Sequence, residues 1–102
     1  MTEARLPPSL REGWTLVDFY ATWCGPCQML SPIIETVAAR FSGRLRVAKL
    51  DVDRSPHVAA AFGVSSMPTM ILCKDGYELA RRVGFLPEPQ LAAWIEGTLS
   101  AA

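Results

Sequence analysis

The order of the apolar patterns along the chain narrows its fold to one class. Four short runs, at residues 15–20, 44–50, 69–73 and 78–83, carry the β-branched, aromatic or alternating residues typical of strands. Helical patterns separate the first three runs and follow the last. Neighbouring parallel strands need such crossovers, whereas the KDGY segment at 74–77 can join the last two runs as a hairpin with an Asp-Gly turn. These observations predict an α/β fold with one mixed sheet.

The first helical pattern follows Cys27 directly. Gly43 is expected to end this helix, and Pro32 lies inside the pattern, where it removes one backbone donor and is expected to kink the helix. The apolar residues recur at steps of three and four, which predicts a helix with one buried face. They are Leu30, Ile33, Ile34, Val37, Ala38 and Phe41.

Two further helices complete the pattern. Ser55 and Pro56 are expected to start a short helix, with a capping side chain followed by proline at the first helical position, and Gly63 is expected to end it. The last stripe predicts an amphipathic C-terminal helix. Its residues are Leu91, Trp94, Ile95 and Leu99.

Length and composition predict a single domain over residues 1–102. The chain is 50% hydrophobic and 20% charged, as globular proteins are. Residues 1–13 contain Pro7 and Pro8 and are expected to be irregular or abbreviated. They lack the apolar stretch of a secretory signal, and no apolar run approaches the roughly 18–20 residues of a membrane span. We expect a cytoplasmic protein that does not associate with membranes, although an exported protein without its signal would look the same.

The charge pattern argues against nucleic acid as a partner. Ten basic side chains balance ten acidic ones, so no net field attracts an anionic polymer or membrane surface. The arginines are scattered, apart from the pairs Arg44/Arg46 and Arg81/Arg82. We interpret these pairs as solvated strand faces, because a phosphate-binding patch needs a wider basic surface.

Two closely spaced cysteines carry the candidate chemistry. An odd count of three cysteines, with only Cys24 and Cys27 close together, does not fit a disulfide-rich scaffold. The CxxC spacing at a helix start places both sulfurs on the first turn, within disulfide distance, and the helix N-terminus lowers the pKa of the first thiol. We expect Cys24 to be the exposed nucleophile and Cys27 to be the resolving thiol that attacks the mixed disulfide.

A structural zinc site is the alternative for a CxxC pair. Tetrahedral zinc needs four ligands, and the other candidates are Cys73, inside a predicted strand, and His57, near a predicted helix start. We interpret Cys73 as a small core residue and His57 as a surface residue. No metal is therefore expected.

The segment VDFYATWCGPC, at residues 17–27, resembles the active-site segment of the thioredoxin family. The resemblance continues through CQMLSPIIE, VAKLDVD, GVSSMPTMIL and KDGYELARRVG, and covers residues 16–100 in consistent order and spacing. It implies a thioredoxin fold, with a mixed central sheet of four to five strands flanked by helices. Because the first predicted strand begins so early, the family's first strand and first helix are expected to be shortened or partly absent. The strand at 44–50 would then have an open edge whose arginines oppose aggregation, and we expect a monomer.

The resemblance also implies a proton-transfer pair. Asp18 stands in the middle of an apolar run, where a carboxylate is costly unless it is paired or protonated, and burial should raise its pKa. The matching aspartate of the family lies beneath the second cysteine and assists its deprotonation. Lys49, on the inward-looking face of the next strand, matches the family's lysine partner of that aspartate. The alternative for Lys49 is an edge lysine that reaches solvent.

By the same resemblance, six residues are expected to bind substrate around the dithiol: Trp23, Gly25, Pro26, Met67, Pro68 and Gly84. Trp23 would shield the site and contact partners, with a half-buried packing role as the alternative. Pro68 matches the family's cis-proline, and Met67 would present its backbone to an extended substrate segment. Tyr20 and Met67 replace the family's usual tryptophan and branched aliphatic residue, which is expected to alter packing and partner preference.

Reduction of protein disulfides is the function that these expectations favour. The resemblance implies regeneration by a thioredoxin reductase that uses flavin and NADPH, while this chain binds no cofactor beyond its own redox-active disulfide, Cys24–Cys27. A thiol oxidase or disulfide isomerase of exported proteins is the first alternative, and the Gly-Pro dipeptide between the cysteines argues against it. A non-enzymatic docking module is the second, and it would not need Asp18 and Lys49 together with both cysteines.

Overall fold

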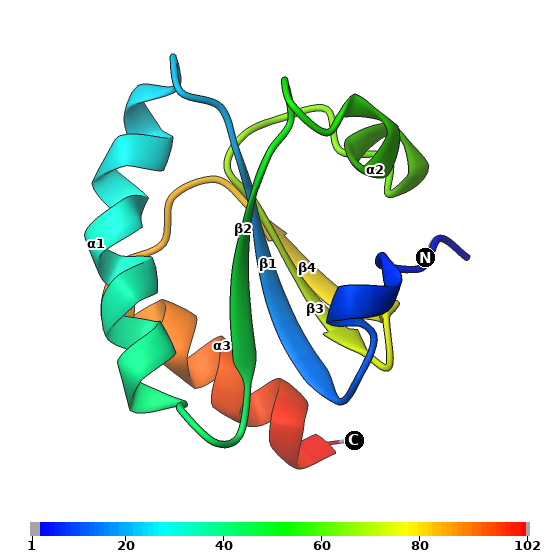
Figure 1. The fold of residues 1–102 in the computed structure, drawn as a ribbon. Helices are drawn as coiled ribbons and strands as arrows, with labels where there is room; N and C mark the ends of the chain where they lie inside the picture. The colour runs from blue at the N-terminus through cyan, green and yellow to red at the C-terminus, as the bar shows by residue number, and fades with distance from the viewer. Residues whose placement is uncertain (1–2, 102) are drawn as a thin grey trace.

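The computed structural model describes residues 3–101, which form a mixed sheet with helices on both faces (Figure 1). The strand order is β2-β1-β3-β4; β1 is parallel to β2 and antiparallel to β3, and β3 is antiparallel to β4. The predicted α/β class and mixed sheet are confirmed, with four strands in the sheet. The elements are the 3-10 helix η1 (Pro8–Leu10), β1 (Trp14–Tyr20), α1 (Gly25–Arg40), β2 (Arg46–Asp51), α2 (Pro56–Ala61), β3 (Thr69–Lys74), β4 (Tyr77–Val83) and α3 (Glu88–Ala101).

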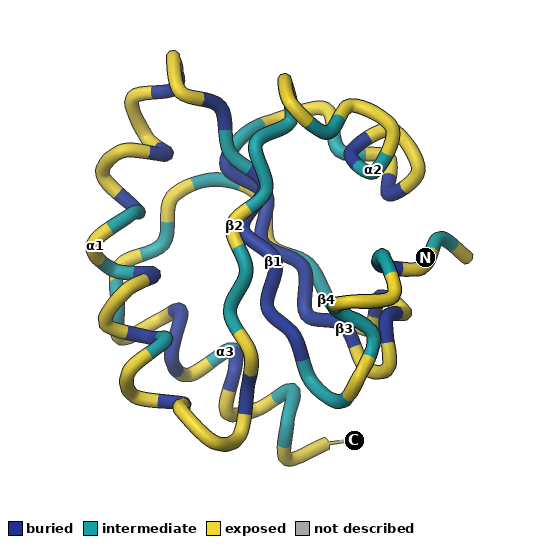
Figure 2. Tube along the Cα trace, in the orientation of Figure 1, coloured by how far each residue is buried: buried dark blue, intermediate teal, exposed yellow. Residues whose placement is uncertain are grey.

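Helices α1 and α3 cover one face of the sheet, and α2 covers the other together with the N-terminal segment (Figure 1). Leu16 and Leu72 pack in the first layer against α1 and α3, whereas Val17 and Ile71 pack in the second. The central strands β1 and β3 are buried along nearly their whole length (Figure 2). Because side chains alternate along a strand, Asp18 faces the same layer as Leu16.

The hairpin between β3 and β4 turns at Asp75 and Gly76, which confirms the predicted Asp-Gly turn. Their φ angles are +51° and +89°, and a two-residue hairpin of this kind needs positive φ at both positions. Beyond the turn, the register shifts: Cys73 pairs with Glu78 but Leu72 pairs with Ala80. The extra residue on β4 is a β-bulge, which the sequence pattern did not predict.

Two expected element starts need correction. The second strand begins at Arg46 rather than Arg44, because the chain still turns there and the N–H groups of Arg44 and Leu45 both donate to the carbonyl oxygen of Phe41. Ser55 does precede α2, with proline at the first helical position, but its side chain makes no capping hydrogen bond.

The interpretation of the arginine pairs as solvated strand faces is wrong for two of the four side chains. Arg44 precedes β2 and forms an exposed ion pair with Glu96. Arg81 is half-buried and pairs with Glu78, whose side chain is only 3% exposed. A buried carboxylate needs a partner, and Arg81 supplies it.

The N-terminal segment lies against the β3–β4 hairpin. Leu6 is fully buried and its N–H donates to the carbonyl oxygen of Gly76 over 2.8 Å, while Arg5 forms an isolated bridge with Tyr77. Residues 3–13 contain η1 but no strand, so the family's first strand is missing from the described chain and β2 is an edge strand. Residues 1–2 of the predicted irregular segment lie outside the described residues. No helix within residues 3–101 is long and apolar enough to cross a membrane.

Candidate active site

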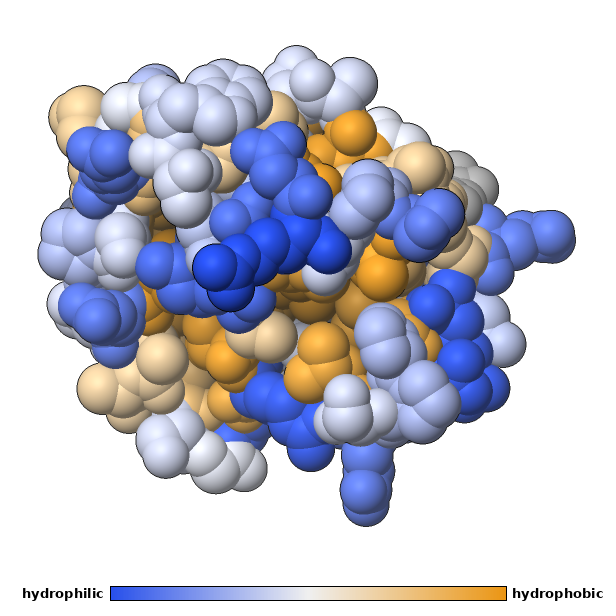
Figure 3. Space-filling view, turned by 45° about the horizontal axis from the view of Figure 1, so that its top comes forward, coloured by the Kyte–Doolittle hydropathy of each residue, from blue (hydrophilic) through white to orange (hydrophobic). Residues whose placement is uncertain are grey.

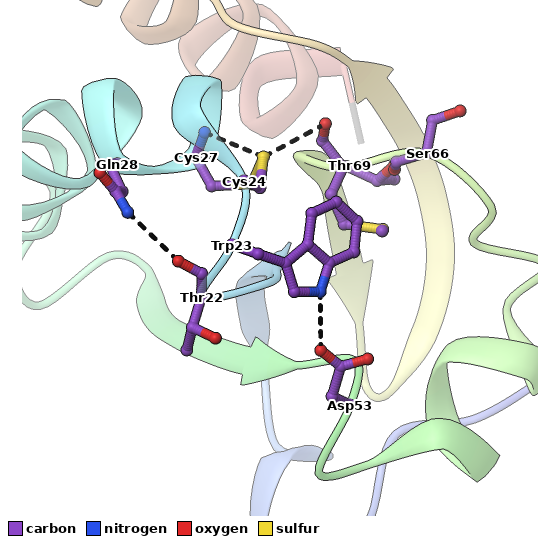
Figure 4. Close-up of a disulfide and its surroundings, with 9 residues drawn as sticks. Thr22, Trp23, Cys24, Cys27, Gln28, Asp53, Ser66 and Thr69 are labelled. Carbon is purple, nitrogen blue, oxygen red and sulfur yellow. Dashed lines mark hydrogen bonds between the residues drawn. A yellow bond between two sulfur atoms is a disulfide. The ribbon is translucent and has the colours of Figure 1, made fainter.

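A disulfide between Cys24 and Cys27 lies at the start of α1 (Figure 4). Cys24 is the N-cap residue and Cys27 belongs to the first turn, with Cα atoms 5.3 Å apart. Pro26 occupies the first turn, where its missing N–H removes no helical hydrogen bond. The strand β1 ends four residues before Cys24, so the rigid centre of the sheet positions the pair.

Burial does not distinguish the two cysteine residues. Cys24 is 5% exposed and Cys27 is 4% exposed, because Ala21, Tyr20 and Met67 pack around the pair. The expectation that Cys24 is exposed is therefore wrong for the disulfide form. A hydrogen bond does distinguish them: the Cys27 N–H donates to Cys24 Sγ over 3.2 Å. Together with the positive end of the helix dipole, this donor favours negative charge on Cys24 in the dithiol.

The loop before β3 faces the disulfide. The carbonyl oxygen of Met67 lies 3.6 Å from Cys24 Sγ, and the Met67–Pro68 peptide bond is cis. On the far side of the loop, the Gly84 N–H donates to the carbonyl oxygen of Pro68 over 2.8 Å. Three of the six predicted substrate-binding residues thus meet at this loop.

Trp23 projects from the surface beside the disulfide, with 68% of the residue exposed. Its indole Nε1–H donates to Asp53 Oδ2 over 2.9 Å (Figure 4). The half-buried packing alternative is therefore not what the structure shows. The sequence pattern missed Asp53, because only the fold brings it next to a tryptophan thirty positions earlier.

The surface at this end of the molecule combines apolar and polar side chains. Figure 3, in which the top of the molecule comes forward, shows several hydrophobic patches beside strongly hydrophilic side chains that cross the middle of the face. Exposed apolar residues include Trp23, Val83 and Phe85, and Val83 and Phe85 flank Gly84. Such a surface is suited to contact with a protein partner.

Asp18 is buried on the α1 face of the sheet, 1% exposed, and neither carboxylate oxygen has a hydrogen-bond partner among residues 3–101. Burial raises its pKa from 3.8 to about 6, while the positive charge of Lys49 acts in the opposite direction. The expected burial and raised pKa are both present. A carboxyl with this pKa can gain or lose a proton near neutral pH.

Lys49 pairs with Asp18 in the register of β1 and β2 but is itself exposed. Its ammonium donates to Ser31 Oγ over 2.8 Å and lies 5.1 Å from the centre of the Tyr20 ring. The lysine does face α1, but the expectation of an inward side chain needs correction, because β2 is an edge strand and leaves it open to solvent. A hollow of about 240 Å³ beside it is lined by Tyr20, Ala21, Thr22, Cys27, Gln28, Ser31 and Lys49.

The two further zinc-ligand candidates do not join the cysteine pair. Cys73 is fully buried in the layer on the α2 side, and burial first, then the nearby Glu78 charge, raises its pKa to about 12. It is a core residue, as predicted. His57 lies on α2, and within residues 3–101 no three His, Cys, Asp or Glu side chains are grouped as a metal site.

Comparison with known proteins identifies close relatives. The thioredoxin family model matches residues 8–97. A thioredoxin from Staphylococcus saprophyticus is 45% identical over 96 residues, covering 94% of this chain and 92% of that protein. A thioredoxin from Staphylococcus aureus strain Mu50 is 46% identical over 92 residues, covering 90% and 88%. The structure of a point-mutant thioredoxin from Halobacterium salinarum has a TM-score of 0.79 and 42% identity, covering 89% of this chain and 79% of that one.

Proposed function

This chain belongs to the thioredoxin family and is a protein-disulfide reductase, and we propose that its activity divides between Cys24 as the attacking thiol and Cys27 as the resolving thiol. The observation that carries this assignment is the Cys27 N–H directed at Cys24 Sγ, which favours a thiolate on Cys24 alone. The redox centre is part of the chain itself, so the chemistry needs no bound cofactor.

Two thiol–disulfide exchanges complete the reaction. The Cys24 thiolate attacks one sulfur of the substrate disulfide, forms a mixed disulfide and expels the other substrate sulfur as a thiolate. The Cys27 thiolate then attacks Cys24 Sγ and releases the second substrate thiolate. Two electrons pass to the substrate, two protons complete its thiols, and Cys24–Cys27 becomes the disulfide seen in the structure.

We assign deprotonation of Cys27 to Asp18. A carboxyl with a pKa of about 6 can accept a proton at neutral pH, and the hollow between Cys27 and Lys49 is open to water that could carry it. Asp18→Asn is expected to slow release of the substrate from the mixed disulfide more than the first attack. Single-turnover kinetics from pH 6 to 9 measure both steps, and an unchanged release rate across that range would exclude this role.

The residues around Cys24 would bind the substrate chain. The Met67 backbone, held beside Cys24 by the loop through Pro68, would pair with an extended segment, and Gly84 would leave room for it. Trp23, fixed by Asp53, and the exposed Gly25 and Pro26 would contact the rest of the partner. Lys49 would tune the charge state of Asp18 from the edge strand.

Family membership implies disulfide-containing substrates and a reductase partner in general. We propose that a flavin- and NADPH-dependent thioredoxin reductase regenerates the dithiol, and that the protein acts as a cytoplasmic monomer without nucleic acid or membrane partners. An oxidase, an isomerase and a docking module are not favoured, since the relatives at about 45% identity over most of the chain are thioredoxins.

Cysteine variants test the division of roles. Cys24→Ser should reduce insulin disulfides no faster than the background, whereas Cys27→Ser should accumulate a mixed disulfide that mass spectrometry detects. Cys73→Ser is the matched control and should keep full activity, because Cys73 is buried on the other side of the sheet. If Cys27→Ser turned over normally, or if Cys24→Ser formed the mixed disulfide, the assignment would be reversed or wrong.

The redox potential distinguishes a reductant from an oxidase. Equilibration with glutathione buffers should show that the Cys24–Cys27 couple is more reducing than the glutathione couple. A potential well above that of glutathione would contradict the proposed direction of electron flow.

A further inference from the structure

The guanidinium of Arg81 bridges β4 and the end of α2. Its Nη2 donates to the carbonyl oxygen of Phe62 over 2.6 Å and to Glu78 Oε1 over 2.7 Å, and its Nε donates to Glu78 Oε2 over 2.6 Å. The Glu78 side chain is 3% exposed and that of Arg81 is 30% exposed. A two-point ion pair with this geometry fixes the guanidinium plane and hence the direction of its third hydrogen bond.

The β-bulge makes this arrangement possible. Residues three apart on a regular strand point to opposite faces of the sheet, so Glu78 and Arg81 would not meet there. The extra residue on β4, Leu79, between the pairs Cys73–Glu78 and Leu72–Ala80 shifts the alternation by one. Both side chains therefore lie on the α2 side, where Phe62 ends the helix.

The segment that Arg81 holds leads directly to the active-site loop. Five residues separate Phe62 from Pro68, and Met67 lies among them with its carbonyl oxygen 3.6 Å from Cys24 Sγ. β4 and the residue that follows it hold both ends of this segment. Arg81 binds the Phe62 carbonyl, and the Gly84 N–H binds the Pro68 carbonyl over 2.8 Å. The hydroxyl of Thr69, the first residue of β3, donates to the carbonyl oxygen of Ser66 in the loop.

We propose that Arg81, oriented by Glu78, is a positioning residue that fixes the loop from Phe62 to Pro68 so that the Met67 backbone can accept a substrate chain. The inference rests on the proposed function, in which Met67 pairs with an extended segment of the substrate. A loop held firmly at both ends loses little freedom when the substrate binds. Without the Arg81 bond, the Phe62 end is held only by the backbone hydrogen bonds that close α2 and by its buried ring, so the loop has more freedom to lose. The rate of reduction of a small disulfide, which reacts with the sulfur atoms and does not pair with the Met67 backbone, would not change.

The test uses the charge-neutral variant Glu78→Leu/Arg81→Leu, which removes the bridge without leaving a buried charge unpaired. Single turnovers of the pre-reduced protein give the half-saturating concentration and the maximal rate for insulin, and the rate with 5,5′-dithiobis(2-nitrobenzoate). The half-saturating concentration for insulin should rise about fivefold, as expected for loss of one hydrogen bond that preorganises the loop. The maximal rate and the rate with the small disulfide should stay within about twofold of the wild type.

Arg44→Leu/Glu96→Leu is the matched control, because it removes an exposed ion pair of 3.0 Å between the turn before β2 and α3. The two double variants replace the same pair of residue types with the same pair of leucines. This control variant should reduce both insulin and the small disulfide with the kinetic constants of the wild type. Glu78→Gln should have an intermediate half-saturating concentration for insulin, between those of the wild type and the double leucine variant. Its amide oxygen can still accept from Arg81, but its NH2 group replaces the second acceptor with a donor.

Several outcomes overturn the proposal. An unchanged half-saturating concentration for insulin does so, and so does an equal loss with both substrates, which would indicate damage to the dithiol itself. If the double leucine variant does not fold, Arg81→Lys replaces it, because a lysine cannot reproduce the fork that binds Glu78 and Phe62 together. The half-saturating concentration of Arg81→Lys for insulin should then rise about threefold. If it did not rise, the proposal would be overturned. A wild-type protein that reduces neither disulfide would instead refute the proposed function.

Discussion

Asp18 is almost completely buried, and within the described part of the chain its two carboxylate oxygens accept no hydrogen bond, so its charge state contributes to the pH dependence of stability. Its pKa of about 6 in the folded protein lies above the ordinary 3.8, so folding favours the protonated form. The contribution of Asp18 to the free energy of unfolding is fully favourable below pH 4, and it is lost as the pH rises through 6. The shift corresponds to roughly 3 kcal/mol in the free energy of unfolding at pH 7 and above.

Asp18→Asn should therefore be more stable than the wild type at pH 8, by an amount approaching that value, and should match the wild type near pH 4. Urea unfolding at both pH values measures the difference. Glu35→Gln, an exposed carboxyl on α1, is the control and should show no such trend. A pH-independent difference between Asp18→Asn and the wild type would contradict the assigned pKa.

At this scale the sequence was informative wherever a residue is unusual for its own segment. Asp18 could be singled out because burying a carboxylate in an apolar strand costs free energy unless the group is paired or protonated. Asp53 and Arg81 could not, since each has its role only through a partner that the fold supplies, the Trp23 indole and the Phe62 carbonyl. The exposure of Lys49 depends on β2 being an edge strand, which is a property of the sheet rather than of the residue.

The turn of the β3–β4 hairpin constrains the residue at position 76. Gly76 has φ +89°, and an added Cβ would lie 2.9 Å from Arg5 Cγ and 3.0 Å from Arg11 Cγ, so the N-terminal segment packs directly on the turn. Gly76→Ala should lower the free energy of unfolding by about 1–2 kcal/mol, chiefly from the left-handed backbone. Gly97→Ala, in the exposed face of α3 with open space around its Cβ, should raise it by up to about 1 kcal/mol.

Thermal or urea unfolding of the two variants makes the comparison. Opposite signs are the expected result, because the two substitutions add the same methyl group to different backbone conformations. If Gly76→Ala were as stable as the wild type, neither the turn conformation nor the contact with the N-terminal segment would be a constraint.

Helices and hairpin were predictable from local patterns, and their boundaries were not. Apolar spacing identified α1 and α3, and Asp75-Gly76 identified the turn, because each signal lies within one element. The start of β2 at Arg46 and the bulge at Leu79 depend on hydrogen bonds to other segments, so sequence alone could not place them. The bulge also turns Arg81 toward the α2 side, where it is half-buried rather than solvated.

For the molecule as a whole, the open edge of the sheet raises the question of self-association. β2 has β1 on one side only, and residues 3–13 do not pair with its outer edge as a strand. Two copies could in principle join their β2 strands in antiparallel fashion about a two-fold axis perpendicular to the sheet. Under that symmetry, two residues paired across the interface must point to the same face of the joined sheet. The two-fold axis must therefore pass between a residue and the same residue of the second copy.

Two pairings would keep most of β2 in the interface, one centred on Lys49 and one on Ala48, and the side chains of β2 disfavour both. Centring on Lys49 places two ammonium groups opposite each other, and centring on Ala48 places Arg46 against Leu50 and Lys49 against Val47. Charged side chains on an edge strand are a known means of preventing such pairing. The protein should therefore be a monomer at micromolar concentration in light scattering. Arg46→Val, which removes one of these charges from the edge, should increase self-association, whereas Arg40→Val, which removes the same charge from α1, should not. A stable wild-type dimer, or equal behaviour of the two variants, would show that the edge charges do not control assembly.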